Sequence, residues 1–236
     1  MNLKKILLFS AVIIILVTLG FSSVNKSISI DSGKETDNSL RSVNGSISIS
    51  NNVIIGGSLT NVNGSIRTGD KCEIKDDVRN VNGSIKLGDN SSAEKVSSVN
   101  GSIRLGENVN IRYRVGSVNG SIKCESGTTI RNDIETVNGS ITLYGTKIGE
   151  GITTINGRIK LKEGSIVNGD VVIKKSKYGF FEKIFRKKRK ELRIRLTGKS
   201  VIKGDIINRD EDREVILEMD KGCRVEGKLI NITKEK

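Results

Sequence analysis

The stretch Val99-Asn100-Gly101-Ser102-Ile103 is one of eight copies of a short phrase that decides the fold of this chain. Successive copies start 18 or 19 residues apart. A repeat this short and regular is typical of proteins in which each repeat is one structural unit stacked on its neighbours. The copies start, in chain order, at Val24, Val43, Val62, Val81, Val99, Val118, Val137 and Ile155.

Apolar and polar residues alternate along each copy. In the copy that starts at Val99, the residues Val99, Ile103 and Leu105 occupy odd positions, with polar residues between them. A period of two predicts a half-buried strand whose valine, isoleucine and leucine face inward. A second alternating piece, residues 109–111, follows, and a lone Val115 leads into the next copy. One such unit cannot bury a core alone. We therefore expect an all-β, single-stranded β-solenoid (β-helix) of 18–19-residue coils.

Stacking places the asparagine of each copy above that of the copy before. Side-chain amides in such a column hydrogen-bond along the stack, so we expect an internal ladder that holds coil to coil. The glycine that follows is replaced only in the first copy, by Lys26, which suits an end coil without a neighbour on its outer side. The expected ladder, called here the asparagine column, consists of Asn25, Asn44, Asn63, Asn82, Asn100, Asn119, Asn138 and Asn156.

The Asn-Gly pair also permits a different fold. It is the strongest short signal for a two-residue hairpin turn, and a series of hairpins would produce an antiparallel meander. A turn alone does not require the flanking valine, serine and isoleucine to recur. The recurrence of the whole phrase therefore favours the solenoid.

The residue types present argue against catalysis. The chain of 236 residues has no histidine, which removes the commonest general base and a leading metal ligand. This speaks against a hexapeptide-repeat acyltransferase, and the outward positions hold mainly Ser, Asn, Lys and Arg rather than the clustered acids of a carbohydrate-active β-helix. Cys72, Cys124 and Cys223 stand at inward positions, as small buried hydrophobes would. We expect no catalytic residue, no metal, no cofactor and no small-molecule substrate.

One outward position of the repeat is often basic. A lysine or arginine occupies it in five of the eight copies, which predicts either a solvated face kept soluble by charge or a stripe for an anionic polymer. A run of acids later in the chain, residues 210–214, is expected to form a surface turn rather than a cation site. The five basic residues are Arg67, Lys86, Arg104, Lys123 and Lys160.

The N-terminal residues 1–23 indicate export. Lys4 and Lys5 precede an apolar run over residues 6–21, a pattern that leaves the N-terminus in the cytoplasm and sends the following chain across the membrane. The run is either a signal peptide cleaved after Ser22 or a retained membrane anchor. In both cases we expect the body of the protein outside the cytoplasm, in the periplasm or cell envelope.

Regular repeats are expected over residues 24–173, a basic aromatic insertion over 174–195, and irregular solenoid coils or a cap over 196–236. Between Lys174 and Lys190 the chain carries nine basic residues and one acid, out of a net charge of +13. Basic residues around exposed aromatics suit an anionic membrane surface. The alternatives are another anionic partner, or aromatics that cover the open end of the solenoid. The expected contact residues are Tyr178, Phe180, Phe181, Phe185, Arg186, Lys187, Lys188, Arg189 and Lys190.

The recurring phrase, followed by Gly-Asp pairs that flank a basic aromatic insertion, resembles exported bacterial β-strand-repeat proteins, described as adhesins or as proteins of unknown function. The C-terminal Gly-Asp portion is also similar to bactofilins, cytoskeletal proteins with a β-solenoid core that polymerise end to end. The resemblance implies a non-enzymatic structural or adhesin-like scaffold of the cell envelope, or alternatively a bactofilin-like polymer at the membrane. The partners it implies are further copies of the chain and an anionic membrane surface, and export argues against nucleic acid.

Overall fold

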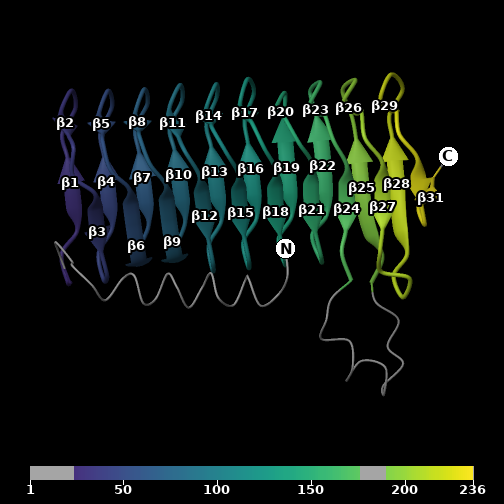
Figure 1. Cartoon of the computed structure of the whole chain (residues 1–236), viewed down its shortest axis with the longest axis horizontal. Helices are drawn as coiled ribbons and strands as arrows, with labels where there is room; N and C mark the ends of the chain where they lie inside the picture. The colour runs from purple at the N-terminus through teal and green to yellow at the C-terminus, as the bar shows by residue number, and fades with distance from the viewer. Residues whose placement is uncertain (1–23, 176–189, 236) are drawn as a thin grey trace, which may run out of the picture.

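The chain forms an all-β solenoid. The computed structural model describes residues 24–175 and 190–235, and its strands lie side by side along a rod (Figure 1). Each turn of chain contributes one strand to each of three parallel sheets, and about ten coils stack at a repeat of roughly 19 residues. The predicted β-solenoid is therefore confirmed. The antiparallel meander is excluded, because the strands pair in parallel with the equivalent strands of neighbouring coils.

Sheets A, B and C take their strands in strict rotation along the chain. Sheet A consists of β1 (Ile28–Ile30), β4 (Ile47–Ile49), β7 (Ile66–Thr68), β10 (Ile85–Leu87), β13 (Ile103–Leu105), β16 (Ile122–Cys124), β19 (Ile141–Tyr144), β22 (Ile159–Lys162), β25 (Leu192–Leu196), β28 (Val215–Met219) and β31 (Thr233–Lys234). Sheet B consists of β2 (Glu35–Thr36), β5 (Ile54–Ile55), β8 (Glu73–Ile74), β11 (Ser92–Ala93), β14 (Asn110–Ile111), β17 (Thr129–Ile130), β20 (Lys147–Ile148), β23 (Ile166–Val167), β26 (Val201–Ile202) and β29 (Arg224–Val225). Sheet C consists of β3 (Leu40–Ser42), β6 (Leu59–Asn63), β9 (Val78–Asn82), β12 (Val96–Ser98), β15 (Val115–Ser117), β18 (Ile134–Thr136), β21 (Ile152–Thr154), β24 (Val171–Ile173), β27 (Ile206–Asn208) and β30 (Leu229–Ile230).

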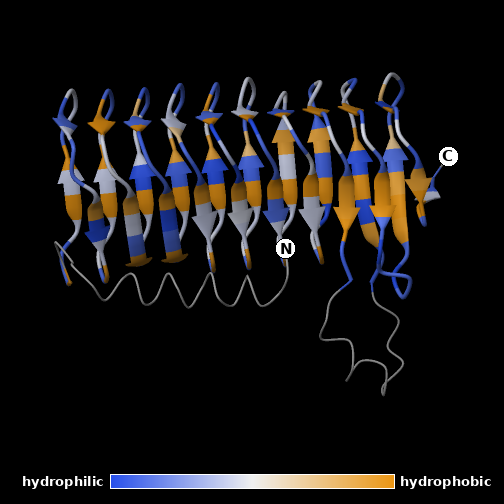
Figure 2. Cartoon of the chain, in the orientation of Figure 1, coloured by the Kyte–Doolittle hydropathy of each residue, from blue (hydrophilic) through white to orange (hydrophobic). Residues whose placement is uncertain are grey.

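A single apolar core runs the length of the rod. The isoleucine of the phrase stacks on its equivalents in register, as in the pairs of Ile66 with Ile85 and of Ile85 with Ile103. These side chains are fully buried, together with the inward residues of the other two sheets. Figure 2 shows the hydrophobic and hydrophilic residues that alternate along the strands. Burying aliphatic side chains stabilises each coil only when its neighbours are present.

The phrase itself is the corner between sheet C and sheet A. The valine was expected to face inward, and this is wrong: Val43, Val62, Val81 and Val99 form a separate apolar cluster outside the main core. The alternation does not continue through the corner, because the chain changes direction between the end of a sheet C strand and the isoleucine that begins the next sheet A strand.

The C-terminal coils continue the same three sheets with unequal lengths of chain. In sheet A, Ile159 pairs with Ile194, Ile194 with Leu217, and Leu217 with Lys234. β25 already begins at Leu192, inside the range expected for the basic aromatic insertion, so residues 192–195 belong to a solenoid strand. In the described ranges no helix is long and apolar enough to cross a membrane.

Candidate functional site

The asparagine column runs along the corner between sheets C and A. Each Asn Nδ2 donates a hydrogen bond to the Oδ1 of the asparagine one coil earlier, with N–O distances between 2.7 and 2.9 Å. The bonds join all eight members, from Asn25 to Asn156. The column lies on the surface, because each of its asparagines is exposed, as the alternation of the repeat predicts. In water each bond contributes at the low end of about 0.5–1.5 kcal/mol.

Arg213 ends the asparagine column at its C-terminal side. Its Nη2 donates to Asn156 Oδ1 at 2.7 Å, and its Nη1 donates to the backbone oxygen of Ile155 at 2.6 Å. The guanidinium thus takes the place that the amide of a further asparagine would occupy. It comes from a residue 57 positions away in sequence, so no local pattern predicts it.

The glycine of the phrase is required by the coil before it. A Cβ built on Gly120 would lie 1.9 Å from the oxygen of Gly101, and one on Gly139 would lie 1.9 Å from the oxygen of Gly120. Real Cβ atoms do not approach an oxygen this closely, so only glycine fits at the normal strand spacing of about 4.8 Å.

This steric requirement has a direction. Along the column the missing side chain always points toward the N-terminal end of the rod: a Cβ on Gly45 would lie 2.5 Å from the oxygen of Lys26. Lys26 occupies the same place in the first described coil, so its side chain projects from the N-terminal end of the stack. No described coil lies there to oppose it.

A second column of coil-to-coil contacts lies on the inner side of the same corner, and sequence reasoning missed it. The residue before each valine is a small polar one with its side chain buried. The amide of Asn61 donates to the oxygen of Gly45 at 2.7 Å, and that of Asn80 donates to the oxygen of Gly64 at 2.8 Å. The sequence could have indicated this burial, because the position never holds a charged or large residue. Its described members are Ser42, Asn61, Asn80, Ser98, Ser117, Thr136 and Thr154.

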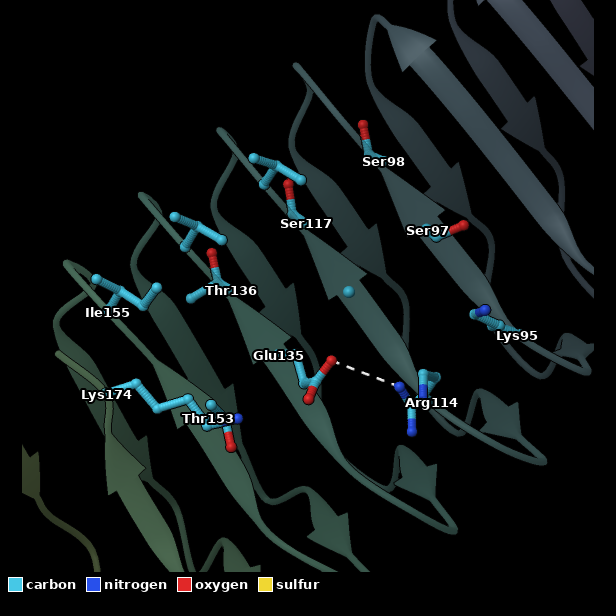
Figure 3. Close-up of a pocket in the computed structure, with 13 residues that line it drawn as sticks. Lys95, Ser97, Ser98, Arg114, Ser117, Glu135, Thr136, Thr153, Ile155 and Lys174 are labelled. Atoms are coloured by element: carbon cyan, nitrogen blue, oxygen red, sulfur yellow. Dashed lines mark hydrogen bonds and ion pairs between the residues drawn. The ribbon is translucent and has the colours of Figure 1, made fainter. Parts of the chain in front are cut away.

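A hollow of about 110 Å³ lies on the outer face of sheet C (Figure 3). Its floor is Gly116, which stands between Ser97 and Glu135 in the register of the sheet. Unlike the glycines of the corner, Gly116 is not forced by the backbone, since a Cβ there would meet nothing closer than 3.7 Å. The other side of the hollow is bordered by Val118 and Val137.

Ion pairs join some of the charged groups around this hollow. Arg114 binds both Asp133, at 3.2 Å, and Glu135, at 3.5 Å. Burial lowers the pKa of Lys95, and the attraction of Asp77 opposes this shift. The Ser97 hydroxyl is buried and has no hydrogen-bond partner within the described residues. The hydroxyl therefore bonds to no base among the described residues, and the hollow has the features of a contact surface rather than those of an activated serine.

The acids near the C-terminus are held by basic residues. Asp212 pairs with Lys175 at 2.9 Å, and the buried Asp210 lies 3.9 Å from Arg213. The expected turn is present, closed by the Arg213 N–H, which donates to the Asp210 oxygen at 3.0 Å; Glu211 and Asp212 are exposed on it, and the Asp210 side chain is buried. No group of three His, Cys, Asp or Glu side chains placed to hold a metal ion occurs in the part of the chain that the structure describes. Of the residues expected to contact a membrane, Lys190 is exposed, and the rest lie outside the described residues.

The cysteines are free thiols of different accessibility. Cys72 and Cys124 are buried, and Cys223 is half-buried. Burial raises the pKa of Cys124, and burial likewise raises that of Cys72. Both buried thiols are protonated at neutral pH and behave as small hydrophobic side chains.

Comparison of the chain with protein-family models, with curated proteins and with solved structures finds no match. Conclusions about activity therefore come from the geometry of the solenoid and its surface.

Proposed function

We propose that this protein is a non-enzymatic, adhesin-like scaffold of the bacterial cell envelope. The observation that carries the proposal is the continuous bonding of coil to coil: three parallel ladders, the asparagine column and the buried polar column all run along one axis. A stack held at so many places around its circumference is a stiff rod. Side chains on its outer faces recur at the strand spacing of about 4.8 Å.

The outer faces support a structural role over a catalytic one. Glycoside cleavage needs two carboxyl groups with different protonation states on one face. On sheet C, Asp133 and Glu135 both pair with Arg114, so one guanidinium engages both carboxyl groups. Export is supported by the sequence alone, through Lys4, Lys5 and the apolar run that follows.

The alternative is a bactofilin-like polymer at the membrane. The exposed Leu229 and Ile230 on the last coil favour it, because β29, β30 and β31 pair on one side only within the described chain. Unpaired strand edges are templates for a further copy. Lys26 opposes it, because a copy added in register at the N-terminal end would meet the Lys26 side chain where the seven later copies of the phrase have glycine.

Sizing and electron microscopy of residues 24–236 test the choice between these functions. We expect a monomeric rod at high concentration, whereas filaments would support the polymer and contradict the scaffold. The variant Lys26→Gly removes the obstruction and is expected to lengthen particles end to end, with Lys34→Gly as the matched control at another exposed lysine of the first coil. A reporter fused after Lys236 is expected outside the cytoplasm, and its retention inside would refute envelope location.

A further inference from the structure

A row of basic side chains runs along the outer face of sheet A. The register places the middle residue of each strand directly beside its neighbour: Arg67 pairs with Lys86, Lys86 with Arg104, and Arg104 with Lys123. Thr142 interrupts the row once before it resumes. This surface, called the basic column, consists of Arg67, Lys86, Arg104, Lys123, Lys160 and Arg195.

Most of the basic column lacks acidic partners. Lys123 pairs with Glu125, and Arg195 lies 3.7 Å from Glu218. The other four cations make no ion pair with any residue in 24–175 or 190–235. Like charges directly opposite on neighbouring strands destabilise a sheet, so the basic column carries a repulsion along its length.

On the other two sheets acids interrupt the cations. On sheet B, Arg112 binds Glu94 of the preceding coil at 3.0 Å. On sheet C, Arg114 binds Glu135 of the following coil at 3.5 Å, although it also repels Lys95. On sheet A, by contrast, four cations follow one another in successive coils.

An aromatic ring fills the interruption in the basic column. Tyr144 lies two residues after Thr142 on β19 and faces the same side of the strand. The ammonium groups of Lys123 and Lys162 each lie 5.0 Å from the centre of its ring. The ring adds an apolar face beside a row of cations.

We propose that the basic column binds a linear acidic polysaccharide, with carboxylates of successive sugars paired to cations of successive coils. A row of positive charges at a fixed spacing of about 4.8 Å matches an extended chain with one charge per repeating unit better than it matches a compact anion. The Tyr144 ring adds an apolar group beside this row for contact with a pyranose. Because the contacts join exposed charges, binding weakens as salt rises.

Titration of the full chain with polygalacturonate, at low and at high salt, tests this. The triple variant Arg67→Gln, Lys86→Gln, Arg104→Gln is expected to weaken binding by on the order of tenfold or more at low salt. The matched control is Lys75→Gln, Arg112→Gln, Arg131→Gln, which removes the same charge from exposed positions near sheet B and should leave binding within about twofold. Circular dichroism checks that both triples fold.

Two further arms separate sugar recognition from charge alone. Tyr144→Leu should weaken binding of polygalacturonate and leave binding of inorganic polyphosphate unchanged. The proposal is overturned if the wild-type chain does not bind polygalacturonate, if both triples lose affinity equally, or if single-stranded nucleic acid binds more tightly at equal salt. These outcomes are independent of the sizing and export tests, because the basic column is the same in a monomer and in a polymer.

Discussion

Substitution of a corner glycine by alanine should separate neighbouring coils. A Cβ on Gly120 would lie 1.9 Å from the oxygen of Gly101 and 2.4 Å from its carbonyl carbon. Relief to a normal contact requires a shift of roughly 1 Å or more between the coils at this corner. The adjacent backbone bond from Asn119 to Val99 is 2.7 Å long, so such a shift takes it beyond hydrogen-bonding range.

The magnitude follows from what the shift breaks. The backbone bond of Asn119 contributes about 1 kcal/mol, and its exposed side-chain bond to Asn100, at 2.9 Å, contributes about 0.5 kcal/mol. Overpacking destabilises the protein by about 1–3 kcal/mol more. The lower entropy of the unfolded alanine variant offsets about 0.4–1 kcal/mol of this loss. We expect Gly120→Ala to lower the free energy of unfolding by roughly 2–4 kcal/mol.

The chain supplies a matched control four residues earlier. Gly116→Ala makes the same chemical change on the same coil, but its Cβ would meet nothing closer than 3.7 Å. We expect it to be neutral or to stabilise by up to about 1 kcal/mol. Guanidinium unfolding followed by circular dichroism measures both midpoints. The two variants can be compared if the slope of unfolding free energy against denaturant concentration is unchanged. Equal midpoints for the two variants would refute the steric account of the glycine column.

Two other predictions concern single side chains. Arg213→Ala should lower the free energy of unfolding by about 2–3 kcal/mol, because the charged donor to Ile155 and Asn156 is lost. Arg213→Lys should recover only part of this stability. Urea unfolding measures both variants, and an unchanged midpoint for Arg213→Ala would contradict this role. In the native protein, iodoacetamide should modify Cys223 before Cys72 and Cys124, because burial raises the pKa of the latter two. Mass spectrometry of peptides gives the order, and equal labelling of Cys124 and Cys223 would show that the core opens.

The sequence was sufficient to predict the stack because the period, the isoleucine and the asparagine recur in all eight copies of the phrase. Each asparagine inside the column has an asparagine on both sides, so register follows from repetition. The orientation of Val81 and its equivalents was not predictable from alternation, because alternation holds only within a straight strand. The buried position of Asn80 was missed for the same reason, since a polar residue reads as outward when the corner is unknown.

Long-range contacts were beyond the sequence pattern. Arg213 reaches Asn156 because the C-terminal coils return the chain to the same corner of the solenoid. The basic residues of sheet A were visible as a recurring type. That these cations lie beside other cations became clear only from the register, which shows which side chains neighbour each other on adjacent strands.

The direction of the glycine requirement also governs how the length of this rod can change by gene duplication. A coil copied from the interior brings its own glycine, meets a glycine carbonyl below it, and extends the stack by about 4.8 Å without any further substitution. A coil inserted ahead of Val24 would place a carbonyl against Lys26, and that lysine would first have to become glycine. Duplication of an interior coil can therefore lengthen the rod, whereas addition of a coil ahead of the first one is blocked. The first coil thus fixes the position of the N-terminal end of the rod.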